Sequence, residues 1–389
     1  MDKTPKGGGT LEADRVTAYL EKPVIQQYKS DVGFRTLVDS VNDNMYVIPK
    51  YQRKYRWNRE KVVDLVESLL RGLPIPPIYT CRNADNQLEI LDGQQRVMSL
   101  FFYYIGAFLD RRKASAVNFT KLDVKENQTF QEALRDQFDL EPLHIILNGE
   151  NGREINVDYA SLPIAVKRKV DYTTITVIEI KIDQPEQREK ILRTIFANLN
   201  KGGELLSEQE QRNGIYNCTF YDMLRNFNQE NQKWRMLWGR EDAKERDMET
   251  LLRFCALRKY TSYIRGKNEF IIDGYQSSYV KMLDCFSEEA MSFTPEESEE
   301  YRKSLEEFME LFEVTNMKFS TKVALLESFY VIFEKKNFRS KITKGMCDEI
   351  LNSSDYKANS RQGTVKMNQM NKRWKAVYEI SVNCHSSDC

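Results

Sequence analysis

The chain has 389 residues, of which 41% are hydrophobic and 30% are charged. This is the composition of an ordinary globular protein and excludes a largely disordered chain. Its 58 basic residues equal its 58 acidic ones, so any attraction to nucleic acid or membrane must come from local clusters. Seven scattered cysteines and only two histidines favour a reducing, cytoplasmic setting and argue against a histidine-based hydrolase or nuclease centre.

Residues 1–24 lack the apolar core of a leader peptide and are expected to form a flexible tail. An extended segment, "DNMYVIPKYQRKYRW", precedes a helix that Asn58 should cap and Gly72 should end. The runs "PIYTC" and "QLEIL" predict two short strands joined by a turn at "NADN". A helix is expected next, over Gln94–Leu109, and its apolar run is too short to span a bilayer.

Residues 111–170 have a polar, irregular pattern that is typical of an insertion or a lid. The β-branched run "DYTTITVIEIKI" then predicts a strand, followed by a helix that begins near Asp183 and ends at a glycine pair. From Ser207 onward the periodicity is helical, and Ser207 with Glu210 forms a capping box. The sequence therefore predicts an α+β protein, with an α/β domain over 25–205 followed by an all-helical domain over 206–389.

The stretch "LEILDGQQRVMSLFF" places five small or polar residues between an apolar strand and an apolar helix. They are Asp92, Gly93, Gln94, Gln95 and Arg96. The first turn of a helix leaves backbone N–H groups unpaired and, with the helix dipole, favours an anion. The glycine permits close approach, the arginine offers a bidentate phosphate fork, and the aspartate could hold Mg²⁺ or position a water. The alternative is that the aspartate only caps the helix and the glutamines are solvated.

Two further segments carry candidate binding residues. "YQRKYRW" with its flanking cations forms the densest basic cluster of the chain, which suits phosphate or stacked-base contacts. Its ordinary alternative is an edge strand protected by charge. "FANLNKGG" ends a helix with amides and a lysine beside two glycines, and taken alone it favours an ordinary glycine cap.

The ordered motifs "IPKYQRKYRW", "GLPIPPIY", "ILDGQQRVMSL" and "IFANLNKGGELLSEQEQRNGIY" resemble the GmrSD-type family. This is the N-terminal domain of modification-dependent restriction enzymes, related to the ParB and sulfiredoxin fold. The closing stretch "SRQGTVKMNQMNKRWKAVYEI" resembles the family's basic final helix. The resemblance implies a ParB/sulfiredoxin-like fold for 25–205, with about 111–170 as an insertion.

The resemblance also implies a site. Its expected catalytic residues are Asp92, Gln95 and Arg96, with Asp92 as the ligand of Mg²⁺. Its expected nucleotide-binding residues are Gln52 and Arg53 beside Tyr51, then Gly93, Gln94, Asn200, Lys201, Gly202, Gly203 and Arg212. Lys201 departs from the small hydroxyl residue that is usual in the family. The expected nucleic-acid contacts are Lys50, Lys54, Arg56, Arg59, Lys372 and Arg373.

The leading hypothesis is a Mg²⁺-dependent NTPase, using ATP or GTP, that serves as sensor or regulator in a bacterial anti-phage or modification-dependent restriction system. No histidine-rich HNH domain is present, so DNA and a separate nuclease or defence protein are the expected partners. A membrane is not expected, and a homo-oligomer is compatible with the sequence. Two alternatives stay open: a DNA-binding adaptor without turnover, and a metal-dependent DNA nuclease built on Asp92.

Overall fold

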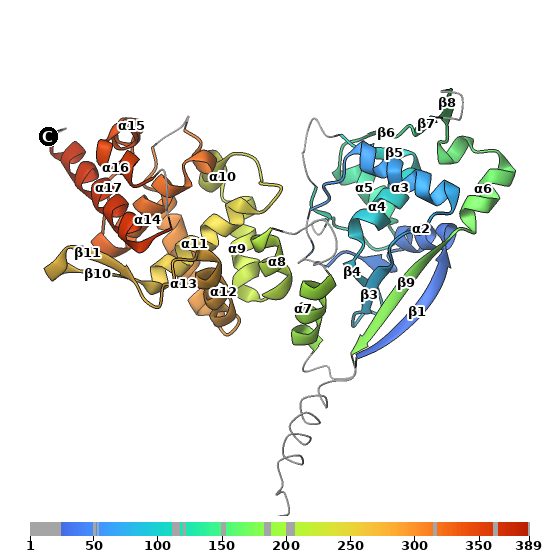
Figure 1. The fold of residues 1–389 in the computed structure, drawn as a ribbon, viewed down its shortest axis with the longest axis horizontal. Helices are drawn as coiled ribbons and strands as arrows, with labels where there is room; N and C mark the ends of the chain where they lie inside the picture. The colour runs from blue at the N-terminus through green and yellow to red at the C-terminus, as the bar shows by residue number, and fades with distance from the viewer. Residues whose placement is uncertain are drawn as a thin grey trace, which may run out of the picture. The chain divides into compact units, whose positions relative to one another are not determined.

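The computed structural model describes residues 25–49, 52, 54–110, 117–119, 122–148, 153–182, 188–199, 207–313, 317–360 and 365–387. The chain divides into two compact units, Met1–Leu205 and Leu206–Cys389 (Figure 1). Within the described ranges, no helix is both long enough and apolar enough to cross a membrane.

A five-stranded sheet organises the N-terminal unit, with strand order β1-β9-β3-β4-β2. The strands are β1 (Ile25–Gly33), β2 (Tyr46–Val47), β3 (Ile78–Arg82), β4 (Leu88–Asp92) and β9 (Thr174–Ile182). β3 and β4 form the antiparallel hairpin that the two short apolar runs predict. β9 lies parallel to β3 and antiparallel to β1. The sheet therefore places β4 between its hairpin partner β3 and the short edge strand β2, which pairs with Leu88 and Glu89 at the start of β4.

Side-chain alternation gives the sheet two different faces. Ile78, Ile90 and Val177 join the main apolar core, beneath the helices α2 (Phe34–Asn42), α3 (Arg59–Arg71) and α4 (Gln94–Ile105). Cys81 and its neighbours on the opposite face form a small cluster with Leu192 of α7 (Arg188–Leu199). Figure 1 shows α7 beside β3 and β4. The junction between β4 and α4 is thus held by packing on both faces of the sheet.

The local signals for helix ends act as predicted, with one exception. Asn58 caps α3 by accepting a hydrogen bond from the backbone of Lys61, and Gly72 ends it in a left-handed conformation. The predicted helix over 94–109 is too long, because Gly106 adopts φ 64° and ends α4 at Ile105. A short strand, β5 (Ala107–Leu109), follows it.

The region over 111–170 contributes to the core where it is described. Its elements are α5 (Phe130–Gln137), β6 (Leu140–Pro142), β7 (Ile146–Asn148), β8 (Glu154–Asn156), a 3₁₀ turn (Tyr159–Ser161) and α6 (Ile164–Asp171). Phe119, Leu134 and Tyr159 are all buried in the main core of the N-terminal unit. This region is therefore more than a surface insertion, because it supplies part of the core of the unit.

The C-terminal unit is helical, as predicted, except for one small hairpin. Its helices are α8 (Glu208–Ile215), α9 (Thr219–Glu230), α10 (Gln232–Trp238), α11 (Arg246–Tyr260), α12 (Tyr279–Ala290), α13 (Pro295–Met309), α14 (Val323–Lys336), α15 (Lys344–Asn352), α16 (Ser354–Ala358) and α17 (Met367–Ser387). Its 3₁₀ turns span Arg265–Lys267 and Phe319–Thr321. The hairpin pairs β10 (Thr261–Ile264) with β11 (Glu269–Ile272), which corrects the expectation of an all-helical domain. The capping box of Ser207 and Glu210 is present and starts α8.

Burial should decide which thiols of this unit react. Cys255 and Cys347 are buried, whereas Cys285 is exposed. Burial raises the pKa of the Cys255 thiol far above its usual range and that of Cys347 to about 12, so little of the reactive thiolate forms at either position. Iodoacetamide at pH 8 should therefore label Cys285 before Cys255 and Cys347, as peptide mass spectrometry can follow. Labelling of Cys255 in the native protein at the rate seen in urea would contradict this packing.

Candidate functional site

The junction between β4 and α4 is bent by a bulge. Tyr79 pairs with Asp92 and the next residue of β3 pairs with Ile90, so Leu91 is an extra residue in β4. A bulge turns the end of a strand and re-aims its side chains. Gly93 follows with φ 102° and is itself the N-cap of α4, without a side-chain cap. Asp92 is thus the last residue of a strand, and the alternative that it caps the helix is not supported.

Arg96 folds back over this turn. Its Nη2 atom donates to Asp92 Oδ2 at 2.8 Å and to the carbonyl oxygen of Pro77 at 2.9 Å. A Cβ atom at Gly93 would lie 3.2 Å from the Arg96 guanidinium and 3.2 Å from the Ile78 side chain. Only glycine accommodates both this contact and the left-handed backbone. The tight turn therefore holds one cation and one carboxylate next to the start of the helix.

Gln95 holds the neighbouring chain segment in place. Its Oε1 atom accepts from the backbone N–H groups of Arg56, at 2.8 Å, and Trp57, at 3.2 Å. Its Nε2 atom donates to the carbonyl oxygen of Lys54 at 3.2 Å. The side chain is buried, and these bonds use both ends of its amide. We therefore assign Gln95 a positioning role, which corrects the expectation that it acts at the reacting atoms.

Gln52 and Tyr55 complete this attachment. The Gln52 amide donates to the carbonyl oxygens of Ile90 and Leu91, at 2.9 and 2.8 Å. The buried Tyr55 hydroxyl hydrogen-bonds Ser99 of α4 at 2.8 Å. Gln52 belongs to the segment expected to be extended; it lies outside any strand and reaches β4 through its side chain. The structure thus brings the "YQRKYRW" segment and the polar junction together.

The side-chain amide of Gln94 differs from that of its neighbour Gln95. Gln94 is 3% exposed, yet among the described residues neither its Nε2 nor its Oε1 atom has a hydrogen-bond partner. Burying an amide without partners costs roughly 1–3 kcal/mol, so such a group in a folded protein calls for an explanation. The glutamines were predicted to be either ligand-binding or solvated, and the burial of Gln94 removes the second alternative.

Thr80 of β3 is a polar residue that sequence reasoning missed. It is fully buried and its Oγ1 atom also has no partner. It pairs with Ile90 in the register of β3 and β4. Threonine within a strand is common because β-branched residues suit strands, so no sequence signal could have singled it out.

The carboxylate of Asp92 suits a magnesium ion that is bound together with the phosphates of a substrate. No group of three or more His, Cys, Asp or Glu side chains in the described residues could hold a metal, and the Asp92 carboxylate is already paired with Arg96. A resident ion held by protein alone does not fit this set. Mg²⁺ usually binds through one or two carboxylates together with substrate phosphates, and Asp92 is a partly exposed carboxylate that meets that requirement.

Of the remaining expected nucleotide ligands, only Arg212 is among the described residues. Arg53, Asn200, Lys201, Gly202 and Gly203 lie outside the described residues, as do Tyr51 and Lys50. Arg212 lies in α8 of the C-terminal unit and is buried there. Its Nε atom donates to Asp284 at 2.7 Å, and Glu249 is 3.7 Å away. This arrangement gives Arg212 a structural ion-pair role and corrects its assignment as a nucleotide ligand.

Several of the basic residues that were expected to contact nucleic acid are buried or ion-paired instead. Lys54 is buried, and Arg59 pairs with Glu141 at 2.7 Å. Arg373 is buried and pairs at 2.9 Å with Glu327, which is equally buried. Buried cations cannot reach a phosphate backbone, so Lys54 and Arg373 are removed from the nucleic-acid candidates. Arg56 is half-buried and Lys372 is exposed.

Fold and site together define an α+β domain with a polar strand-to-helix junction, joined to a helical unit. Among known families, the N-terminal domain of the GmrSD restriction endonuclease matches residues 34–217. These residues therefore belong to the GmrSD restriction endonuclease N-terminal domain family, which confirms the resemblance found in the motifs. No curated protein matches the chain. A solved structure, the C2221 form of a Pnob8-like ParB-N domain, is 10% identical with a TM-score of 0.26, over 92% of this chain and 98% of that one.

Proposed function

We propose that the N-terminal unit binds a nucleoside triphosphate at the junction of β4 and α4 and hydrolyses it. The observation that carries this proposal is Gln94, a buried amide without partners at the first position of a twelve-residue helix. A helix N-terminus favours an anion, and the Gln94 amide supplies a donor and an acceptor to a ligand bound there.

Arg96 and Asp92 have complementary parts in this proposal. Arg96 is a cation at the turn, where its Nη2 atom contacts Asp92, and it offers a second guanidinium nitrogen to phosphate oxygens. Asp92 would hold a Mg²⁺ ion that comes with the nucleotide, and the ion would neutralise phosphate charge. Gln52 and Gln95 keep the adjoining segment fixed through bonds to backbone atoms. Phosphoryl transfer depends mainly on such positioning and on electrostatic stabilisation.

The biological role that we propose is that of a sensor or regulator in a restriction system that acts on DNA. The family to which residues 34–217 belong is named after a restriction endonuclease, which supports an association with DNA. These 389 residues hold two histidines, too few for an HNH centre within them, so we assign them no DNA cleavage by such a centre. Nucleotide hydrolysis would then switch the chain between two states.

The test is phosphate release from ATP, GTP, CTP and UTP with Mg²⁺, with and without DNA. The full chain is compared with Arg96→Ala and with the matched control Arg82→Ala. Arg82 lies on β3, next to β4, at the end of the hairpin opposite Asp92, where it pairs with Glu179. We expect turnover that the control retains and that Arg96→Ala lowers by roughly a hundredfold, since loss of one charge-stabilising donor has effects of that size.

Two results would overturn parts of this proposal. Binding without turnover for every nucleotide would leave a nucleotide sensor and remove hydrolysis. Neither binding nor turnover would favour the DNA-binding adaptor, in which Arg96→Ala leaves the affinity for DNA unchanged. Stimulation by DNA would support the sensing role.

A further inference from the structure

The helix α6 of the N-terminal unit is unusually exposed. Of its eight residues only Val170 is buried. Lys167 lies over the ring of Tyr159 at 4.3 Å and fixes one side of the helix. The side chains of Ile164 and Tyr172, at and just after its two ends, are 70% and 81% exposed. Large apolar side chains exposed at both ends of so short a helix indicate a surface that another molecule covers.

The exposed side of α6 is also cationic. Arg168 and Lys169 are both exposed, and the charged end of neither side chain makes a hydrogen bond or an ion pair in the described part of the chain. The partner should therefore combine an apolar floor with negative charge. A DNA duplex supplies the charge, but its phosphate backbone offers nothing to bury the side chain of Ile164.

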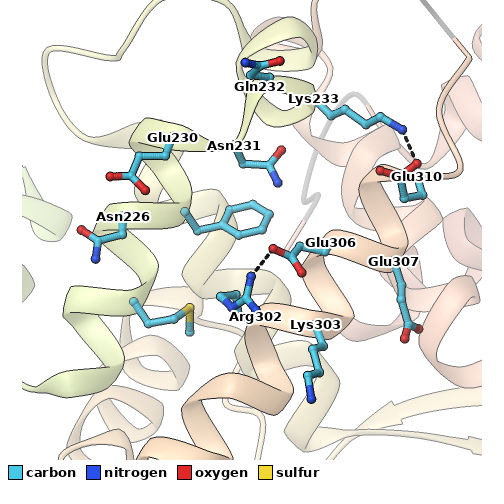
Figure 2. Close-up of a pocket in the computed structure, with 12 residues that line it drawn as sticks. Asn226, Glu230, Asn231, Gln232, Lys233, Arg302, Lys303, Glu306, Glu307 and Glu310 are labelled. Atoms are coloured by element: carbon cyan, nitrogen blue, oxygen red, sulfur yellow. Dashed lines mark hydrogen bonds and ion pairs between the residues drawn. The ribbon is translucent and has the colours of Figure 1, made fainter.

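A groove on the C-terminal unit has these properties. It lies between α9 with the start of α10 on one side and α13 on the other, and encloses about 1020 Å³. Figure 2 shows its polar walls. Phe227, which is buried, and the half-buried Met223 line it from α9.

The rim of this groove carries more negative than positive charge. Four glutamates line it, against two lysines and one arginine. Figure 2 shows that Arg302 and Lys233 are engaged by Glu306 and Glu310. Glu230 and Glu307 keep no partner within the described ranges and are exposed. These two carboxylates are available to pair with cations from another molecule.

The two surfaces also match in size. A helix of eight residues is about 12 Å long and about 10–12 Å across, which corresponds to a volume of about 1,000 Å³. We propose that the chain self-associates, with α6 of one copy seated in the groove between α9–α10 and α13 of a second copy. Apolar side chains at the ends of α6 meet the floor, and Arg168 and Lys169 meet Glu230 and Glu307. Since each copy carries both surfaces, two such contacts can close a two-fold dimer.

Charge reversal tests this pairing. One variant carries Arg168→Glu and Lys169→Glu on α6, and a second carries Glu230→Lys and Glu307→Lys in the groove. All four positions are exposed, so each fold should be retained. The matched control reverses two exposed cations elsewhere in the N-terminal unit, with Lys125→Glu and Arg135→Glu. Molar mass is measured by sedimentation velocity over a wide range of concentration.

We expect the full chain and the control to dimerise and each single-surface variant to dissociate at least about tenfold more readily, because like charges face each other across the contact. Two rescues are expected. The chain that carries all four substitutions should dimerise again. An equimolar mixture of the two single-surface variants should form a mixed dimer, because both of its contacts then join opposite charges.

Three outcomes would overturn the proposal. The first is a full chain that stays monomeric at every concentration. The second is a loss of association that neither rescue restores. The third is an α6 variant of unchanged mass whose affinity for duplex DNA falls, which would make α6 a nucleic-acid contact instead.

Discussion

Replacing Gln95 by leucine is expected to lower the free energy of unfolding by about 3 kcal/mol, because three backbone groups then lose their partners at about 1 kcal/mol each. Those groups are the N–H of Arg56, the N–H of Trp57 and the carbonyl of Lys54. Urea denaturation followed by circular dichroism measures the change. Gln27→Leu, at an exposed strand position, is the matched control and should have little effect.

The same substitution should also loosen the segment that Gln95 holds. Limited proteolysis should then cut near Lys54–Trp57 more rapidly than in the parent chain. A loss of stability below about 1 kcal/mol, with no change in proteolysis, would mean that the segment is held by Gln52 and Tyr55 alone.

Replacing Gln94 by leucine is expected to have the opposite effect on stability. The change removes a buried amide that has no partner, so the free protein should gain about 1 kcal/mol. The affinity for nucleotide should fall at least about tenfold, since the ligand loses a donor and an acceptor that no water replaces. Denaturation measures the first quantity and isothermal calorimetry the second.

The two quantities separate the possible roles of Gln94. A destabilised variant would mean that the amide has a structural partner in solution. A stabilised variant that binds nucleotide as the parent does would mean that the orphaned amide serves something other than this ligand. Only a gain in stability together with a loss of affinity supports a binding residue kept at the expense of the fold.

Adjacent glutamines can have such different roles because consecutive residues of a helix point about 100° apart. Gln95 faces the Lys54–Trp57 segment and Ser99 lies one turn further along the same side, where it hydrogen-bonds Tyr55. Gln94 faces away from these partners. The motif alone therefore identifies both glutamines. It does not show that Gln95 holds the neighbouring segment while Gln94 has the binding role that we propose.

Some features of this fold follow directly from local sequence. The hairpin of β3 and β4, the strand β9, the caps of α3 and the capping box of α8 were all predicted, because each depends on residues close together in the chain. The strand β1 was missed. Its sequence is polar and mostly exposed, and it is a strand because all nine of its residues pair with β9, which no local pattern records.

The sequence by itself determined the α+β character of the N-terminal unit, the helical character of the second, the membership of residues 34–217 in the GmrSD N-terminal domain family and the place of the polar junction. The tertiary structure decided which polar residues are already satisfied. Gln95, Arg212 and Arg373 have partners supplied by distant segments, whereas the side chain of Gln94 has none in the part of the chain that the structure describes. The physical reason is that burial and hydrogen bonding depend on what the fold brings alongside a residue, and side-chain type alone does not specify those neighbours.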